Sequence, residues 1–228
     1  MNLSSGGRPG NGVRLSPNEL QNRDLINDPA LLGFRVEGRE KNGDDYDKKR
    51  PDIVELKFDG FEYSILNDGS VRLDAYDGSA SEMAIPSEIG GRRVVSFGAS
   101  LFRDCEILTR IEFDSDNKLF STDGLAVFSK DGEVLVRLAV SLTEYIVPEG
   151  CRAIGNHAFD SLETIKRVAL PGTLKSIGKL SFAKSGIETI SIPSSVETIG
   201  ERAFYSCRDL VACSFADGLR EIGEAAFS

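Results

Sequence analysis

The chain has 228 residues, of which 40% are hydrophobic, so it can build one large domain or two small ones. Its formal net charge of −9 argues against nucleic acid as the partner, because nucleic-acid phosphates require a basic footprint. The same charge disfavours anionic membrane surfaces, and no stretch approaches the ~18 apolar residues of a membrane helix. We therefore expect neither nucleic-acid binding nor membrane insertion.

The first segment, residues 1–52, is rich in Gly, Asn, Asp and Arg and is predicted to be a flexible N-terminal tail. Within it, the stretch 16–27 favours one or two helical turns, with Ser16 as the N-terminal cap. The tail starts without the apolar segment of a signal peptide. Either the protein stays inside the cell, or the chain is a fragment whose signal lies elsewhere.

Two β-hairpins are predicted next, because apolar and polar residues alternate on both sides of a glycine-containing turn. The first spans residues 61–76 and turns around Gly69. We assign residues 53–80 to a β-hairpin that caps the N-terminal end of the domain. The second hairpin spans residues 125–138, and we expect it to form an insertion near 118–140 in the segment that follows.

The remainder of the chain, residues 81–228, repeats the motif I-G-x-x-A-F and ends in an incomplete repeat. The motif glycines are 23, 22 and 23 residues apart, and a divergent copy, FGASLF, starts at residue 97. Such self-similarity at a short period predicts a repeat solenoid. The four regular copies are IGNHAF (154–159), IGKLSF (177–182), IGERAF (199–204) and IGEAAF (222–227).

Each repeat also carries an apolar-x-apolar pair before the motif, followed in three copies by proline. This pattern is typical of a short strand with one buried face, which proline ends because it has no N–H to donate. We expect parallel strands on one face of the solenoid and short turns or helical turns on the other. The motif glycine is expected to relieve a tight turn or a close approach between coils. The motif phenylalanines are predicted to stack in one aromatic column, made of Phe102, Phe159, Phe182, Phe204 and Phe227.

The repeat resembles the BspA-like, or treponemal, type of leucine-rich repeat, whose consensus reads roughly L-x-x-I-x-I-P-x-x-V-x-x-I-G-x-x-A-F-x-x-C. The copy at 186–207, GIETISIPSSVETIGERAFYSC, matches it well, and the resemblance covers about residues 58–228. It implies a leucine-rich-repeat solenoid. Proteins of this family are typically found on bacterial or protist surfaces, and binding to host or matrix proteins and to other cells is attributed to them. The resemblance therefore implies a module for adhesion or recognition at the cell surface.

No residue set in the sequence predicts catalysis, a cofactor or a metal ion. His157 is the single histidine, and its slot holds unrelated residues in the other copies, so we expect an outward, variable position. There is no C-x-x-C pair, and one histidine is too few for a zinc cluster. The four cysteines occupy slots that apolar residues fill in other repeats, so we interpret them as free core residues: Cys105, Cys151, Cys207 and Cys213.

The outward residues of the predicted strands are our candidates for partner binding. Most are small and polar, which lets a partner approach the backbone closely but offers no aromatic hot spot. The alternative interpretation of the same residues is a solvated sheet face without a partner. The candidates are Glu144, Ile146, Arg167, Ala169, Thr189, Ser191, Ala212 and Ser214.

The final coil leaves apolar residues such as Phe215 and Phe227 without a following coil. Stacked arrays normally end in a polar cap, so either the chain is part of a longer array or its end packs against another copy. We interpret the chain as a non-enzymatic protein-interaction module, at the cell surface by the resemblance. The alternatives are a structural or oligomerising spacer solenoid and an intracellular interaction scaffold.

Overall fold

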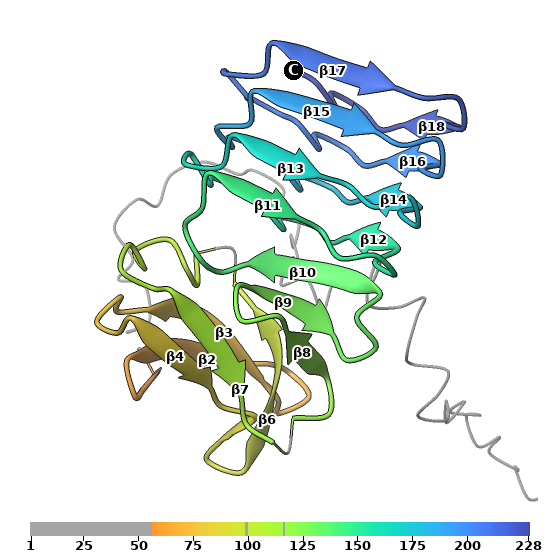
Figure 1. Ribbon diagram of the computed structural model, residues 1–228. Helices are drawn as coiled ribbons and strands as arrows, with labels where there is room; N and C mark the ends of the chain where they lie inside the picture. The colour runs from red at the N-terminus through yellow and green to blue at the C-terminus, as the bar shows by residue number, and fades with distance from the viewer. Residues whose placement is uncertain (1–55, 99, 116) are drawn as a thin grey trace, which may run out of the picture.

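The computed structural model describes residues 56–98, 100–115 and 117–228, so the tail and helical turns predicted at 1–52 lie outside the described residues. The described part of the chain consists of strands and turns and contains no helix. Figure 1 shows regular coils stacked on one another in the C-terminal half, beside a less regular group of strands from the N-terminal half. We call residues 56–140 the N-terminal region and residues 141–228 the repeat region. The predicted repeat solenoid is confirmed.

The N-terminal region begins with a five-stranded sheet, whose strands in spatial order are β1 (Leu56–Phe58), β2 (Phe61–Ile65), β3 (Val71–Tyr76), β6 (Arg92–Phe97) and β5 (Glu88–Ile89). β2 and β3 form the hairpin predicted at 61–76. Its turn contains Gly69, whose φ of 84° lies in the left-handed region that favours glycine, and whose N–H donates to the Leu66 carbonyl at 2.9 Å. β3 and β6 pair in parallel, so the hairpin belongs to a larger mixed sheet.

Two further groups of strands connect this sheet to the repeat region. The first is a parallel pair, β4 (Glu82–Ile85) and β7 (Arg110–Phe113). The second is an antiparallel meander in the place of the predicted insertion, with the strands β8 (Phe120–Thr122), β9 (Ala126–Ser129) and β10 (Val134–Leu138).

The repeat region contains two parallel sheets. The first sheet consists of β11 (Glu144–Ile146), β13 (Arg167–Ala169), β15 (Thr189–Ile192) and β17 (Ala212–Phe215). In the repeat region, the second sheet contains the two-residue strands β12 (Ala153–Ile154), β14 (Ser176–Ile177), β16 (Thr198–Ile199) and β18 (Glu221–Ile222). Because β10 pairs in parallel with β12, the meander is continuous with this second sheet.

The second sheet differs from the expected arrangement, which had only turns on that side of the solenoid. The motif isoleucines pair there in a parallel register, Ile177 with Ile199 and Ile199 with Ile222. A turn follows each strand, and the residue two positions after the motif glycine adopts a left-handed φ in every copy, although none of these residues is glycine. These residues are His157 (φ 59°), Leu180 (54°), Arg202 (54°) and Ala225 (53°).

The motif glycines lie where neighbouring coils touch, as expected for a close approach. A Cβ placed on Gly200 would lie 2.6 Å from the backbone nitrogen of Lys179 and 2.7 Å from the carbonyl carbon of Gly178. The φ of Gly200 is not left-handed, so the position requires glycine for space and not for backbone freedom. Outside the motif, a Cβ on Gly172 would meet nothing within 4 Å.

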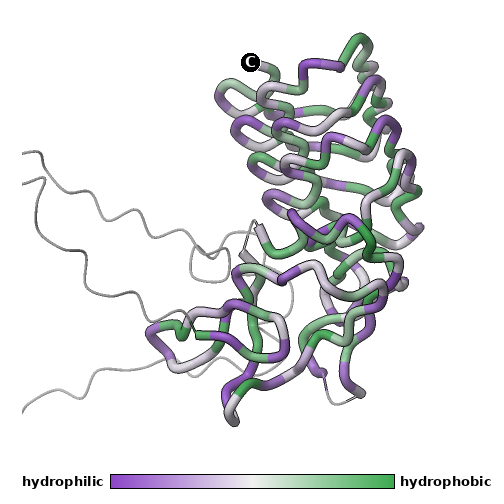
Figure 2. Tube along the Cα trace, turned by 90° about the vertical axis from the view of Figure 1, so that its left-hand side faces the viewer, coloured by the Kyte–Doolittle hydropathy of each residue, from purple (hydrophilic) through white to green (hydrophobic). Residues whose placement is uncertain are grey.

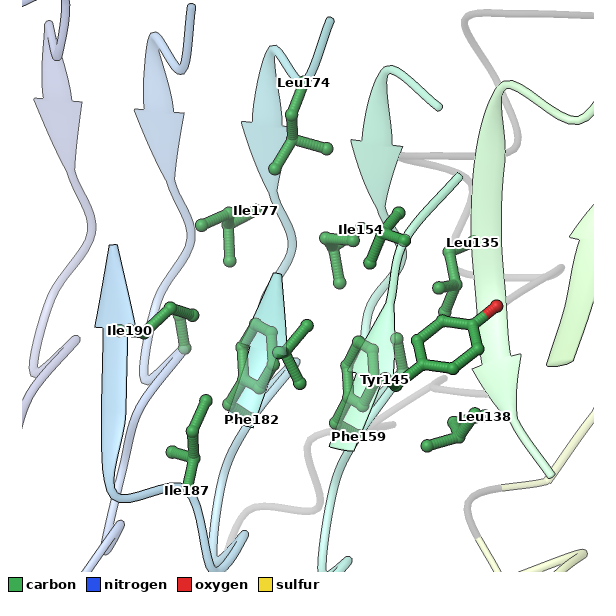
Figure 3. Packing of buried hydrophobic residues seen from close by; sticks show 14 of the residues in the cluster. Leu135, Leu138, Tyr145, Ile154, Phe159, Leu174, Ile177, Phe182, Ile187 and Ile190 are labelled. Carbon is green, nitrogen blue, oxygen red and sulfur yellow. The ribbon is translucent and has the colours of Figure 1, made fainter. Parts of the chain in front are cut away.

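The aromatic column is present in the repeat region, and Figure 3 shows the parallel rings of Phe159 and Phe182 beside Tyr145. Ring centroids are 4.6 Å apart for Phe159 and Phe182, 5.0 Å for Phe182 and Phe204, and 4.9 Å for Phe204 and Phe227. The prediction was wrong for Phe102, which packs in the core of the N-terminal region. The meander intervenes between the divergent copy and the regular coils, so Phe102 cannot continue the stack.

The molecule has two hydrophobic cores that meet at the boundary between its regions. One core contains the buried side chains of β9 to β16 with Phe159, Phe182 and Phe204 of the column, and the other gathers residues from β2 to β9. Leu125 and Leu142 pack against both cores. Figure 2 shows hydrophobic and hydrophilic residues alternating along every coil, which is how each coil keeps one side buried and the other in water.

Candidate functional site

The outward side chains of the first parallel sheet lie together on one exposed surface, which we call the sheet face. Successive side chains of a strand point to opposite sides, so Tyr145, Val168 and Ile190 are buried while their neighbours are exposed. The structure brings all eight candidate residues onto this face and leaves each exposed: Glu144, Ile146, Arg167, Ala169, Thr189, Ser191, Ala212 and Ser214.

The parallel register arranges these residues in two rows that run along the stack of coils. Each strand contributes one residue to each row, so the sheet face extends over four consecutive coils (Figure 1). The first row is Glu144, Arg167, Thr189 and Ala212. The second row is Ile146, Ala169, Ser191 and Ser214.

The chemistry of the sheet face changes from β11 to β17. At the β11 end, Arg167 forms an ion pair with Glu144, so the two charges neutralise each other. Beside them Ile146 has 76% of its surface exposed, so it offers an apolar contact at this end of the face. At the β17 end the face carries only small side chains, and Ser214 Oγ donates to Ser191 Oγ at 3.0 Å. The face is therefore electrically neutral and is apolar at one end.

The β11 end of the sheet face is attached to the meander by a partly buried hydrogen bond. Tyr145 donates its hydroxyl proton to Asp123 Oδ2 at 2.6 Å. The other oxygen of Asp123 accepts the backbone N–H groups of Leu125 and Ala126 at 2.8 and 2.9 Å. Burial, together with the hydrogen bond to Asp123 and its charge, raises the pKa of Tyr145 above its usual range. The first strand of the face is therefore held to the loop between β8 and β9.

A second polar cluster lies where the N-terminal region meets the repeat region. His157 was expected to point outward, but its residue is only 9% exposed, which corrects that expectation. Its left-handed backbone places Nδ1 2.7 Å from Asp160 Oδ2. Ser161 donates its hydroxyl proton to the other oxygen of Asp160 at 3.0 Å, and Arg137 is buried nearby in β10.

The charges of this cluster depend on one another. Burial lowers the pKa of Arg137 to about 10, and the negative charge of Asp160 opposes that shift. Burial alone would raise the pKa of Asp160, but its hydrogen bonds with His157 and Ser161 and the charge of Arg137 lower it overall. One signal for this cluster is present in the sequence, an arginine at an apolar position of the stretch VLVRL. We interpret the cluster as structural, because it joins the two regions.

The four cysteines are free, as interpreted from their slots. Cys105 and Cys151 are buried, while Cys207 and Cys213 pack partly buried against the core of the repeat region. Burial raises the pKa of Cys213 to about 11, and burial with the charge of nearby aspartates does the same for Cys105. These thiols are therefore mostly protonated at neutral pH and are weak nucleophiles.

Within the part of the chain that the structure describes, no group of three or more His, Cys, Asp or Glu side chains is placed to hold a metal ion. Within the same residues, no helix has the length and hydrophobicity needed to cross a lipid bilayer.

The stacked coils, the parallel strands of the repeated motif and the exposed parallel sheet define a leucine-rich-repeat solenoid. Residues 137–228 match the family model of the BspA type leucine rich repeat region in six copies. That part of the chain is therefore a BspA-type leucine-rich repeat region, and the match does not extend to residues 58–136, which the resemblance also covered. Comparison with curated protein sequences found no significant match.

Two solved structures resemble the fold over 63% of this chain. One is a leucine-rich repeat protein from Eubacterium ventriosum ATCC 27560, with 21% sequence identity and a TM-score of 0.51. The other is the pneumococcal vaccine antigen PcpA, with 28% identity and a TM-score of 0.52. The chain spans 38% and 35% of the length of those two chains, respectively.

Proposed function

We propose that the chain is a non-enzymatic protein-interaction module that binds a protein partner through the sheet face and acts at the cell surface. The single observation that carries this proposal is the sheet face itself, an exposed and continuous surface built from four strands in register. Leucine-rich repeats suggest protein binding in general. The cell-surface location is inferred from the resemblance to BspA-type repeat proteins, which are typically found on bacterial surfaces.

The composition of the sheet face favours a partner with a neutral, closely fitting surface. In the second row, the small side chains of Ala169, Ser191 and Ser214 let the backbone of a partner come close to the sheet. Ile146 provides an apolar contact at the β11 end of the same row. The ion pair between Glu144 and Arg167 leaves no net charge to attract a strongly charged partner. We expect shape and apolar contact to contribute most of the affinity, because exposed ion pairs contribute little.

The proposal is tested by covering the small residues with long side chains. The double variant Thr189→Arg, Ser191→Arg should lose at least about tenfold in affinity for whichever protein of a purified extracellular-matrix array the parent chain binds. The matched control is Gly172→Arg, Ser194→Arg, which adds the same charge at exposed positions away from the sheet face. Binding that survives in the first variant, with an unchanged circular dichroism spectrum, would contradict the proposal.

A second candidate function is self-association through the last coil. The observation that favours it is the outer side of that coil, where Phe215, Ile222 and Phe227 are 47%, 52% and 41% exposed. β17 and β18 also have no neighbouring strand on that side among the described residues, and exposed strand edges readily pair with another chain.

Light scattering after size-exclusion chromatography distinguishes this candidate from the first. If the last coil associates, Ile222→Lys should shift the protein from dimer to monomer. Ile146→Lys is the matched control, since it places the same charge on an exposed isoleucine of the sheet face. A monomeric parent chain would exclude self-association, and a loss of dimer only in the Ile146 variant would assign it to the sheet face.

A further inference from the structure

One coil of the repeat region is a residue shorter than its neighbours, and the shortening falls at one corner. The strand core residue follows the motif phenylalanine by nine positions in two coils, from Phe159 to Val168 and from Phe204 to Cys213. In the coil between them, Ile190 follows Phe182 by only eight positions. The deletion lies just before β15, where the chain bends into the first sheet (Figure 1).

The shortened corner is built around Gly186. Two residues span this corner in the neighbouring coils, whereas Gly186 spans it alone. Its N–H donates to the Leu162 carbonyl at 3.0 Å, which draws the chain inward against the preceding coil. A Cβ on Gly186 would lie 1.9 Å from the carbonyl oxygen of Glu163, so no other residue can take this path. At Gly186 the chain is therefore drawn further inward than at the same corner of the coils before and after it.

This arrangement leaves a groove of about 570 Å³, which we call the corner groove. Its floor is formed by Ser185 and Gly186, and its walls come from the coils on either side. The residues that line it are Glu163, Lys166, Lys184, Ser185, Gly186, Ser206, Arg208 and Asp209.

One ion pair already crosses the corner groove. Lys166 Nζ lies 2.8 Å from Asp209 Oδ2, although the two residues belong to coils on opposite sides of the shortened one. This hydrogen bond and the charges around it raise the pKa of Lys166, so the lysine stays protonated and engaged. The pair spans one part of the groove from wall to wall.

Two other cationic side chains line the groove and have no partner among the described residues. Among residues 56–98, 100–115 and 117–228, neither the Lys184 ammonium nor the Arg208 guanidinium has an ion-pair or hydrogen-bond partner. Lys166 is already balanced by Asp209 and by Glu188, which lies 4.0 Å away, so Lys184 and Arg208 remain as two unpaired cations beside the carboxylate of Glu163, in a chain whose net charge is −9. A local excess of positive charge on an acidic protein is a place where an anion gains attraction that the rest of the surface denies it.

We propose that the corner groove binds a carboxylate side chain of an acidic peptide segment, held between Lys184 and Arg208. The planar guanidinium of arginine matches a carboxylate in a paired hydrogen-bonding geometry. The carboxylates of Glu163 and Asp209 line the same groove and repel a doubly charged phosphate more than a singly charged carboxylate. The site is separate from the sheet face, so it does not depend on the function proposed above.

The proposal is tested by nuclear magnetic resonance titration of the full chain with the blocked tripeptide acetyl-Glu-Glu-Glu-amide. We expect saturable shifts of the amide signals of Ser185, Gly186 and Arg208 that weaken as salt is added. The charge-reversed variant Lys184→Glu, Arg208→Glu should lose them, with amide signals outside the groove in place. The control Arg103→Glu, Lys130→Glu makes the same change in net charge at exposed residues outside the groove and should keep the shifts.

Two further titrations make the outcome specific. Acetyl-Gln-Gln-Gln-amide should cause no shift at these amides, and inorganic phosphate should cause a weaker one than the acidic peptide. Absence of saturable shifts, equal loss in the control variant, or equal binding of the glutamine peptide or phosphate would overturn the proposal. The variant Thr189→Arg, Ser191→Arg should leave the shifts unchanged, which separates failure of this site from failure of the sheet face.

Discussion

The repeat region and the N-terminal region pack their phenylalanines in different ways. In the repeat region, three successive ring pairs stack within 4° to 7° of parallel. In the N-terminal region, the rings of Phe97, Phe113 and Phe120 meet at angles between 23° and 54°. Repetition imposes one geometry on each coil, so a residue's environment there is set by its neighbours along the stack. The irregular region instead fits side chains from different strands together once.

The largest effect is expected from removing one ring from the column. Phe182→Ala should lower the free energy of unfolding by about 4 kcal/mol, because Phe182 is fully buried between two parallel rings. Phe113→Ala in the N-terminal region should cost about 2 kcal/mol, since Phe113 is only partly buried. Urea denaturation followed by circular dichroism measures both, and equal losses would contradict the difference between the regions.

A somewhat smaller effect is expected from adding one carbon atom to a motif glycine. Gly200→Ala should destabilise the protein by about 3 kcal/mol, because the new Cβ meets backbone atoms of the preceding coil that cannot move aside. Gly172→Ala, at an open position of the same region, should change stability by less than about 0.5 kcal/mol. The measurement is the midpoint of thermal unfolding. Equal shifts of the midpoint in the two variants would contradict the close contact between the motif glycines and the preceding coil.

The junction between the regions is expected to respond more weakly. Tyr145→Phe removes the hydroxyl that binds Asp123 and should cost about 1.5 kcal/mol. The loop should also exchange its amide hydrogens faster at Leu125 and Ala126, whose N–H groups bind the same carboxylate. Tyr63→Phe is the control in the N-terminal region, because the Tyr63 hydroxyl has no hydrogen bond among the described residues. Unchanged exchange in the Tyr145 variant would mean that the hydrogen bond does not hold the loop.

The smallest effect has the opposite sign. Ser181 takes the alanine slot of the motif, and its hydroxyl is fully buried without a hydrogen-bond partner. Ser181→Ala should therefore stabilise the protein by about 1 kcal/mol, visible as a higher unfolding midpoint. Ser185→Ala should not stabilise it, because Ser185 Oγ lies 3.6 Å from Cys207 Sγ. A lower midpoint for Ser181→Ala would show that the buried hydroxyl is satisfied in solution.

Repetition explains which parts of the fold could be predicted from the sequence. Each position of the repeat occurs in several copies, so the buried strand positions and the motif glycines could be assigned from the sequence pattern alone. The divergent copy offered one sample only, and Phe102 was placed in the wrong core because the pattern does not show how the meander separates the coils. Two-residue strands such as β16 (Thr198–Ile199) are too short to show an alternation.

The candidate site divides in the same way. Alternation within the strands located the exposed face, and whether it binds a partner stays a prediction. The burial of His157 could not be predicted, because its environment comes from Arg137 and Asp160 at a junction that occurs once. The corner groove had a sequence signal, the 22-residue spacing, but its charged walls depend on residues two coils apart.

The left-handed residues of the motif turns have a mechanical consequence. The N–H of His157 donates to the Lys179 carbonyl, that of Leu180 to the Glu201 carbonyl and that of Arg202 to the Glu224 carbonyl, so each of these three strained turns is held by the coil after it. When the last coil is pulled away, the turn before it loses its support and becomes the next to yield. Under tension the array should therefore unravel from its C-terminal end in even steps. Each step would release 22 or 23 residues, roughly 75 Å of extended chain.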